Sequence, residues 1–306
     1  MGKASRTKVE STRREKIAAQ RAAQHRAEQR RRILIASGSV VAVLAIVLVF
    51  IVVKLNSTPP SDNSPNGPTG AALASVVSGV TSVPASTLDK VGTGSGAVTA
   101  KPTTISGSAL TANGKPEVLY MGAEYCPYCA AERWAMIVAL SRFGTFSGLA
   151  TVHSAAANGA GQAEPDPNTP TWTFVHAKYT SKYLTFTPVE LQTNIPDRST
   201  GSYTNLETPT SAQEALINKY DSSSGGAIPF VDFGNKYLIA GASYNAGVLA
   251  GLSWATIAAD LSNPSSPVAQ AVDGTANYIT AAICQLTGDQ PASACTATVK
   301  SLESQI

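Results

Sequence analysis

The sequence predicts an α/β domain that follows a single transmembrane helix, and three features support this prediction. An uncharged apolar stretch of membrane-spanning length lies near the N-terminus. Beyond it, strand-like and helix-like segments alternate along the chain. Four cysteines fall into two local pairs in this second part. With 306 residues, 43% of them hydrophobic, the chain is long enough to bury a core, which excludes a wholly disordered protein.

The apolar stretch runs from Ile33 to Val53 and contains no charged residue and no proline. A helix of this length covers ~30 Å, the hydrocarbon thickness of a bilayer. Three arginines at 30–32 precede it and only Lys54 follows it, so the positive-inside rule predicts a cytoplasmic N-terminus. We therefore expect a single-pass protein of the cell membrane whose C-terminal domain is extracytoplasmic. A cleaved signal peptide is the alternative, although its apolar region would be shorter, at ~7–15 residues.

The N-terminal tail carries much of the positive charge. Residues 1–32 hold 11 of the 23 Lys+Arg and 3 of the 20 Asp+Glu, so the rest of the chain is mildly acidic. We interpret residues 1–32 as a basic cytoplasmic tail and expect no nucleic-acid partner for the folded part. Nucleic-acid binding by the tail itself is the alternative. Residues 54–70 contain four prolines among Ser, Asn, Thr and Gly, and they form the predicted linker.

Residues 71–306 form the predicted extracytoplasmic domain, whose first half mixes strands with helices. Apolar residues at helical spacing predict a helix over 73–80. Asn113-Gly114 predicts a hairpin between strands at 103–110 and 117–122. The further elements expected are a helix from about Cys126 to Arg142, a strand over 149–154, a loop over 155–170, and strands over 171–175 and 183–187.

The second half of the domain is predicted to be helical around one hairpin. Gly234-Asn235 predicts that hairpin, between strands at 230–233 and 237–240. The helices expected are one capped by Thr210 and ending at Tyr220, one capped by Asn245 and ending at about Leu261, and two whose first turns contain Pro267 and Pro291.

Cys126-Pro127-Tyr128-Cys129 lies between a predicted strand and the N-terminus of a predicted helix. Unpaired backbone N–H groups and the helix dipole favour a thiolate there, and they lower a cysteine pKa below its usual ~8.5. We expect Cys126 to be the catalytic nucleophile and Cys129 to resolve the mixed disulfide, with no cofactor. Zinc knuckles share the Cys-x-x-Cys spacing, so a zinc site made from all four cysteines is an alternative; we expect no metal.

Cys284 and Cys295 form the second pair, at the end of one predicted helix and early in the next. Locality pairs them with each other, which predicts a structural disulfide that closes a helical hairpin. Its small loop implies ~3 kcal/mol of stabilisation. A second redox pair that relays electrons to Cys126 and Cys129 is the alternative.

The segment from Met121 to Cys129 resembles the active-site segment of the thioredoxin superfamily, and its Pro-Tyr dipeptide is the one that glutaredoxins carry. Ile228-Pro229-Phe230-Val231 resembles the strand whose cis-proline faces the cysteines in these folds. The wider pattern, over about 71–306, is similar to membrane-anchored prokaryotic thioredoxin-like proteins grouped as a domain of unknown function. The resemblance implies a thioredoxin-like fold with an insertion at roughly 155–210 and a C-terminal helical hairpin.

Ile228-Pro229 lies between a glycine-rich turn and an apolar strand, where a proline removes no ladder hydrogen bond. We predict a cis peptide bond here, with Pro229 in contact with the Cys126–Cys129 pair. Ile228 and Pro229 are then the expected substrate-binding residues, because the Ile228 backbone would pair with an extended polypeptide as an added strand would.

Tyr120 occupies the position, six residues before Cys126, at which thioredoxins place a buried aspartate. The acid/base group for Cys129 therefore does not carry over from the family. Glu124, Glu132 and Asp232 are the candidate substitutes. Glu190 is interpreted as part of a solvated edge.

The dithiol motif and the predicted topology together indicate a membrane-tethered thiol–disulfide oxidoreductase that acts on the thiols of exported proteins. Export favours oxidation or isomerisation over reduction, and an oxidase would need a partner such as a quinone-linked membrane thiol oxidase. The alternative is a non-catalytic binding or chaperone-like module with structural disulfides. A reduction potential below about −300 mV would indicate an inert bridge, whereas exchanging pairs lie nearer −120 to −270 mV.

Overall fold

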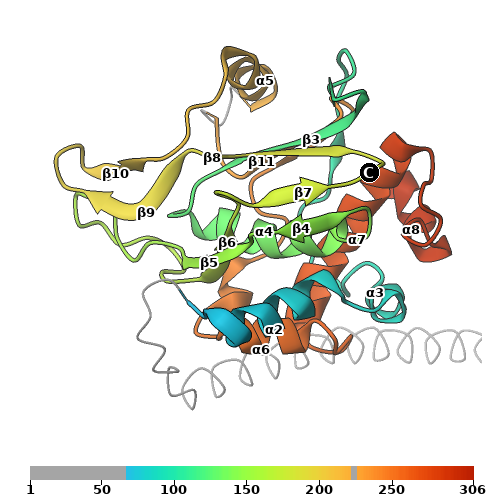
Figure 1. Ribbon diagram of the computed structural model, residues 1–306, viewed down its shortest axis with the longest axis horizontal. Helices are drawn as coiled ribbons and strands as arrows, with labels where there is room; N and C mark the ends of the chain where they lie inside the picture. The colour runs from blue at the N-terminus through green and yellow to red at the C-terminus, as the bar shows by residue number, and fades with distance from the viewer. Residues whose placement is uncertain (1–66, 222–225) are drawn as a thin grey trace, which may run out of the picture. The chain divides into compact units, whose positions relative to one another are not determined.

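The computed structural model describes residues 67–221 and 226–306 (Figure 1). The predicted tail at 1–32, the predicted transmembrane helix at 33–53 and most of the predicted linker at 54–70 lie outside these residues. Within the described ranges, no single helix combines the length and the apolar composition needed to cross a membrane. Helices α2 (Gly70–Thr81) and α3 (Ala85–Val91) meet that criterion only as a pair, which is bent by 58°.

A six-stranded mixed sheet forms the centre of the domain (Figure 1). Strand β8 runs parallel to β3, whereas β11 is antiparallel to both β3 and β12. The predicted α/β class is therefore confirmed. The strands are β1 (Thr103–Thr104), β12 (Tyr237–Ala240), β11 (Phe230–Phe233), β3 (Lys115–Gly122) and β2 (Thr111–Ala112) in this order, with β8 (Thr185–Glu190) also paired with β3.

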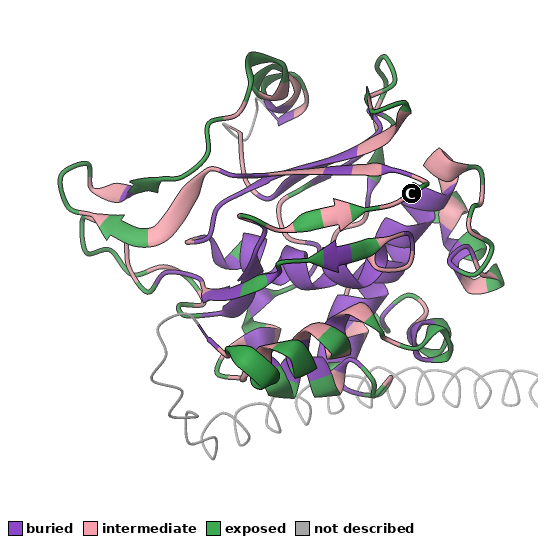
Figure 2. Cartoon of the chain, in the orientation of Figure 1, coloured by how far each residue is buried: buried purple, intermediate pink, exposed green. Residues whose placement is uncertain are grey.

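The two faces of this sheet are covered by different helices. Helices α4 (Pro127–Leu140) and α7 (Pro267–Thr287) lie on one side, and α5 (Ser211–Asp221) lies on the other (Figure 1). Successive strand residues point to opposite faces, so Val118 and Val231 join the α4 side while their neighbours join the α5 side. Figure 2 shows α4 and α7 buried over nearly their whole length. The main core thus lies between α4, α7 and the sheet.

Helices α4 and α7 both begin with a capping side chain followed by a proline, a pattern that is typical of helix N-termini. Pro267 is the first residue of α7, and the Ser266 side chain accepts a hydrogen bond from the Ala269 N–H. The helix ends at Gly288, which adopts a left-handed conformation at φ 62°. Pro127 and Cys126 play the corresponding roles at the start of α4. These predicted helices are confirmed.

Residues 145–205 add three two-stranded sheets to the fold. Sequence periodicity does not predict β4, β7, β9 or β10, in which polar residues predominate. The pairs are β4 (Thr145–Ser147) with β7 (Lys178–Thr180), β5 (Ala150–His153) with β6 (Pro170–Thr173), and β9 (Gln192–Asp197) with β10 (Ser202–Asn205). The predicted insertion at 155–210 needs correction, because it contains not only β6, β7, β9 and β10 but also β8, a strand of the central sheet.

The predicted strand at 103–110 is wrong. Asn113 and Gly114 do form the hairpin turn, with φ of 53° and 72°, but only β2 pairs with β3 through it. Strand β1 pairs with β12 at the other edge of the sheet. Between β1 and β2, the Asn235 side chain donates to the Ser108 carbonyl at 2.8 Å. Side-chain hydrogen bonds therefore hold this segment as a loop.

Two helix predictions in the C-terminal part need correction. Asn245 caps only the 3₁₀ turn η2 (Ala246–Leu249), and Ser253 caps a separate helix, α6 (Trp254–Asp260). Gly251, at φ 73°, separates them with a conformation that a continuous helix excludes.

Pro291 does not lie in a first turn, because Thr296 caps α8 (Ala297–Leu302), which η3 (Glu303–Gln305) follows. Pro291 lies instead in the turn after α7.

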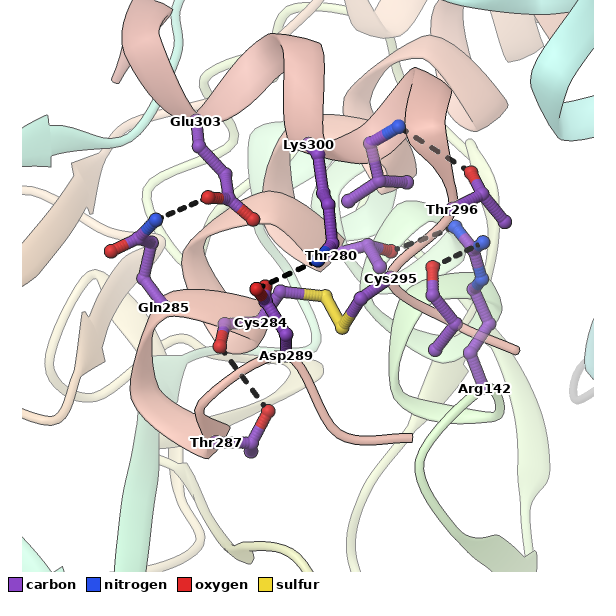
Figure 3. Close-up of a disulfide and its surroundings, with 12 residues drawn as sticks. Arg142, Thr280, Cys284, Gln285, Thr287, Asp289, Cys295, Thr296, Lys300 and Glu303 are labelled. Atoms are coloured by element: carbon purple, nitrogen blue, oxygen red, sulfur yellow. Dashed lines mark hydrogen bonds and ion pairs between the residues drawn. A yellow bond between two sulfur atoms is a disulfide. The ribbon is translucent and has the colours of Figure 1, made fainter. Parts of the chain in front are cut away.

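The predicted disulfide between Cys284 and Cys295 is confirmed (Figure 3). It joins the last turn of α7 to the segment before α8, with 5.8 Å between the two Cα atoms. Both residues are buried. Arg142, just beyond α4, donates to the Ala294 carbonyl at 2.7 Å and ties this hairpin to the C-terminal end of α4.

Removing this disulfide should lower stability without altering the fold. For a closed loop of this size, the chain-entropy model gives a loss of about 3 kcal/mol in the Cys284→Ala/Cys295→Ala variant. Urea unfolding of the full-length chain, with the unsubstituted chain as control, measures this loss. An unchanged unfolding midpoint would show that the bridge does not restrict the unfolded chain.

Asp273 is a buried carboxyl group inside α7. It is inaccessible to solvent, and neither of its oxygens has a hydrogen-bond partner among the described residues. Burial raises the pKa of Asp273 to about 8 and that of Glu132 to about 7. The charges of both act on Tyr244, which also lies in this core. The folded domain therefore holds two carboxyl groups that keep their protons well above the usual carboxyl range.

Stability should fall as the pH rises from about 4, where an unfolded aspartate titrates, to about 8. Between these values the folded state binds more protons than the unfolded state, so the free energy of unfolding decreases with pH. Asp273→Asn, which resembles the neutral acid, should flatten this decrease in urea unfolding series at pH 5 to 8. Asp289→Asn, at an exposed site, is the control. An equally steep decrease in Asp273→Asn would contradict this assignment.

Candidate functional site

Cys126 and Cys129 lie where β3 passes into α4. Cys126 is the N-cap of the helix, and its sulfur accepts a hydrogen bond from the Cys129 N–H at 3.3 Å. Pro127 follows as the first helical residue, where a backbone N–H is not needed. The predicted placement at a helix N-terminus is confirmed.

The two cysteines are free thiols, and their surroundings shift their pKa values in opposite directions. A hydrogen bond from the Cys129 thiol, with help from the Cys129 N–H and the charge of Arg133, lowers the pKa of Cys126 despite its burial. Burial raises the pKa of Cys129 well above its usual value. Cys126 is therefore the better nucleophile, and Cys129 is the thiol that retains its proton.

The segment before β11 faces the cysteines. The Ile228–Pro229 peptide bond is cis, as predicted. The Cys126 thiol lies 3.8 Å from the Ile228 carbonyl oxygen, to which it can donate. This proximity follows from the sheet, since β11 directly follows Pro229 and pairs with β3, which leads to Cys126. The structure thus brings together Cys126, Cys129 and Ile228.

Arg133 and Glu190 form a bidentate ion pair one helical turn beyond Cys129. The Arg133 Nε lies 2.9 Å from Oε1 of Glu190, and Nη2 lies 2.6 Å from Oε2. Neither side chain is exposed, and Glu190 also accepts the Phe174 N–H. Burial lowers and Glu190 raises the pKa of Arg133, which ends above its usual value. A fixed positive charge therefore lies near both thiols.

The interpretation of Glu190 as part of a solvated edge is wrong. Along β8, Glu190 shares a face with Phe186, which joins the core on the α4 side. Arg133 of α4 meets Glu190 on this same face. Glu190 stands between Val189 and Leu191, and this local pattern does not reveal that the carboxylate itself is buried. The one available signal was an arginine within a helix that is otherwise largely apolar.

The three candidate acid/base residues lie in different surroundings relative to the cysteines. Asp232 lies on the α5 side of the sheet, since it alternates with Val231 and Phe233 of the other face. Glu132 accepts hydrogen bonds from the Ser243 N–H and hydroxyl, at 2.9 and 3.1 Å. Glu124 is buried next to the cysteine turn, and burial raises its pKa. Of these three residues, Glu124 alone remains as a candidate.

The hairpin of β9 and β10 forms one side of the site. Tyr125 stacks on Tyr203 of β10, with ring centres 4.1 Å apart and planes 7° from parallel. The Glu124 N–H donates to the Gln192 carbonyl of β9 at 2.9 Å. Tyr128, between the cysteines, is exposed. The sequence does not predict this stack, because Tyr125 and Tyr203 are far apart in the chain.

The two cysteine pairs lie at opposite ends of α4. This 14-residue helix is ~21 Å long, with Cys126 at its start and the Arg142 contact to the disulfide hairpin beyond its end. A zinc site made from all four cysteines is therefore wrong. A direct electron relay would need contact between the pairs, which this separation does not provide. Over the described ranges, no group of three or more His, Cys, Asp or Glu residues could hold a metal ion.

Comparison with known proteins gives one family match. The model of a family described as Domain of unknown function (DUF929) matches residues 101–285, more than half of the chain. The matched region contains both Cys126 and Cys129 and the Ile228-Pro229 segment. No curated protein and no solved structure matches the chain.

Arg133→Met should destabilise the fold by about 3–5 kcal/mol, because Glu190 would remain buried without a partner charge. Adding Glu190→Leu should restore most of this loss, since the pair is then replaced by apolar contact. Urea unfolding of the single and double variants measures both effects. Lys300→Met, which breaks the exposed pair with Asp289, is the matched control and should change little. A double variant as unstable as Arg133→Met would argue against the ion pair as the cause.

Proposed function

The chain belongs to the DUF929 family, and we propose that it is a thiol–disulfide oxidoreductase with a thioredoxin-like fold. The observation that carries this proposal is the setting of Cys126. It caps a helix, accepts the Cys129 N–H and lies against the Ile228 carbonyl. A low-pKa thiol beside a second, buried thiol is the arrangement that disulfide exchange requires.

The order of the elements supports a thioredoxin-like core. Strands β8, β3, β11 and β12 lie side by side, with one parallel and two antiparallel pairs. Helix α4 connects β3 towards β8, and α5 connects β8 to β11 on the opposite face. The cysteines then lie at the end of the first strand of this core, and a cis-proline precedes its third strand.

The proposed reaction exchanges one disulfide for another. The Cys126 thiolate attacks a substrate disulfide, which forms a mixed disulfide and releases one substrate sulfur as a thiolate. The Cys129 sulfur, after losing its proton, attacks the Cys126 sulfur and releases the second substrate thiolate, so two electrons pass from the protein to the substrate. Oxidation of a substrate dithiol runs through the same steps in reverse. An extended substrate would pair with the Ile228 backbone.

We also propose an extracytoplasmic, membrane-tethered location. The Cys284–Cys295 disulfide supports it, since structural disulfides persist mainly in oxidising compartments. In such a compartment the exchange would oxidise or isomerise the thiols of exported proteins. A quinone-linked membrane thiol oxidase is then the class of partner that would restore the Cys126–Cys129 disulfide.

A non-catalytic binding module is the second candidate function. The observation that favours it is the burial of both free thiols, since only 5% of Cys126 is exposed. A substrate disulfide must therefore reach a sulfur that is almost wholly covered. Thiol reactivity therefore separates the two candidates.

Cys129→Ser should accumulate mixed disulfides through Cys126, because the second attack is lost. Non-reducing electrophoresis of the full-length chain, incubated with an unfolded protein that contains disulfides, detects these adducts. Cys126→Ser should form none, and Cys284→Ala/Cys295→Ala with Cys129→Ser should form as many as Cys129→Ser alone. If Cys129→Ser forms no adduct and Cys126 is not alkylated by iodoacetamide, the binding module is the correct reading.

A further inference from the structure

Two buried hydrogen-bond donors near the cysteines have no partner among the described residues. These are the hydroxyl of Tyr120 on β3 and Nη1 of Arg133 on α4. Neither residue is exposed to solvent. A buried donor without a partner costs stability, so such groups are rare in folded proteins and need an explanation.

Both donors lie on the α4 side of the sheet. The guanidinium carbon of Arg133 lies 5.7 Å from the centre of the Tyr120 ring. Phe174 packs edge-on against the same ring, with 5.2 Å between ring centres. Phe174 and Arg133 therefore fix the ring, and the hydroxyl is directed along β3 towards the cysteine turn.

Gly122 shows where the Tyr120 hydroxyl lies. A Cβ atom on Gly122 would be 2.0 Å from this oxygen, so the hydroxyl occupies the space that a side chain at 122 would need. Besides burial, the charges of Cys129 and Cys126 both raise the pKa of Tyr120, so both sulfurs lie near this side chain. The Tyr120 hydroxyl therefore lies beside Gly122, close to the turn that carries the cysteines.

We propose that the Tyr120 hydroxyl and Arg133 Nη1 stabilise the Cys129 thiolate during disulfide exchange. The inference rests on the proposed function, and it identifies Tyr120 as a positioning residue for the Cys129 sulfur. In the reducing direction, Cys129 gives its proton to a base, for which Glu124 is the remaining candidate, before its sulfur attacks Cys126. In the oxidising direction, a substrate thiolate attacks Cys126 and the Cys129 sulfur leaves as a thiolate. Both directions form the same buried anion.

The chemistry of these two groups suits that role. Burial raises the pKa of Tyr120 well above its usual value, so the hydroxyl keeps its proton and can donate it in a hydrogen bond. Arg133 uses Nε and Nη2 for Glu190, which leaves Nη1 for another acceptor. An aspartate at position 120 would accept the proton of Cys129, whereas this tyrosine stabilises the anion that remains.

Direct titration of Cys129 tests the inference without relying on activity. In full-length Cys126→Ser with ¹³Cβ-labelled cysteine, Cys129 is the only free thiol, because Cys284 and Cys295 are bonded. Adding Tyr120→Phe should raise the pKa of Cys129 by about one unit in the NMR titration, a tenfold loss of thiolate near neutral pH. Tyr179→Phe is the matched control, because its hydroxyl donates to the Leu140 carbonyl at the far end of α4.

Thermal unfolding separates this role from a structural one. Tyr120→Phe removes a hydroxyl that has no partner, so its midpoint should equal or exceed that of the unsubstituted chain. Tyr179→Phe breaks a hydrogen bond and should lower the midpoint. A lowered midpoint in Tyr120→Phe would show that its hydroxyl is bonded within the fold, which overturns the proposal.

Exchange with bis(2-hydroxyethyl) disulfide then measures the kinetic effect. In the full-length chain at pH 7, Tyr120→Phe should slow closure of the Cys126–Cys129 disulfide about tenfold while the first attack by Cys126 is unchanged. An unchanged Cys129 pKa in Tyr120→Phe overturns the inference, whether or not the unsubstituted chain exchanges disulfides. A raised Cys129 pKa in a chain that shows no exchange would support the role of Tyr120 and reject the proposed function.

Discussion

Arg133 and Glu190 join the helix that carries both free thiols to the strand that runs parallel to β3. Two parallel hydrogen bonds fix the direction of the guanidinium as well as its distance, so α4 can rotate little on the sheet. Neither charge reaches solvent, and a shifted helix would leave both unpaired at a cost of several kcal/mol. The orientation of Cys126 and Cys129 towards Ile228 depends on this constraint. The same guanidinium supplies the positive charge that acts on both sulfurs.

The site places two chemically identical side chains, three residues apart, in opposite electrostatic surroundings. Cys126 sits at the helix terminus, where a backbone N–H and the neighbouring thiol donate to its sulfur. Cys129 lies one turn inside, where burial is the largest influence on its pKa. The helix N-terminus therefore makes Cys126 the nucleophile and leaves the proton on Cys129. No further acidic side chain is needed for this difference between the two thiols. The insertion hairpin contributes Tyr203, which stacks on Tyr125 directly before Cys126.

Short sequence patterns predicted the helices, turns and disulfide that are formed by residues close together in the chain. The N-termini of α4 and α7, the Asn113-Gly114 and Gly234-Asn235 turns and the Cys284–Cys295 bridge all follow from residues close in sequence. Contacts between distant segments were not visible in this way. The burial of Glu190 depends on Arg133, and the loop before β2 depends on Asn235, more than a hundred residues away. The break at Gly251 reflects a backbone conformation that helical periodicity alone does not detect.

The parallel pair of β3 and β8 also affects how the chain reaches this structure. Residues 123–184 separate the two strands, so the ends of a long segment must meet before the first parallel hydrogen bond forms. Contacts of such high sequence separation slow folding, because chain entropy is lost before the pairing stabilises it. Until β8 pairs with β3, one edge of β3 lacks a partner strand and stays open to other chains. The folding chain would then pass through a state that is vulnerable to aggregation.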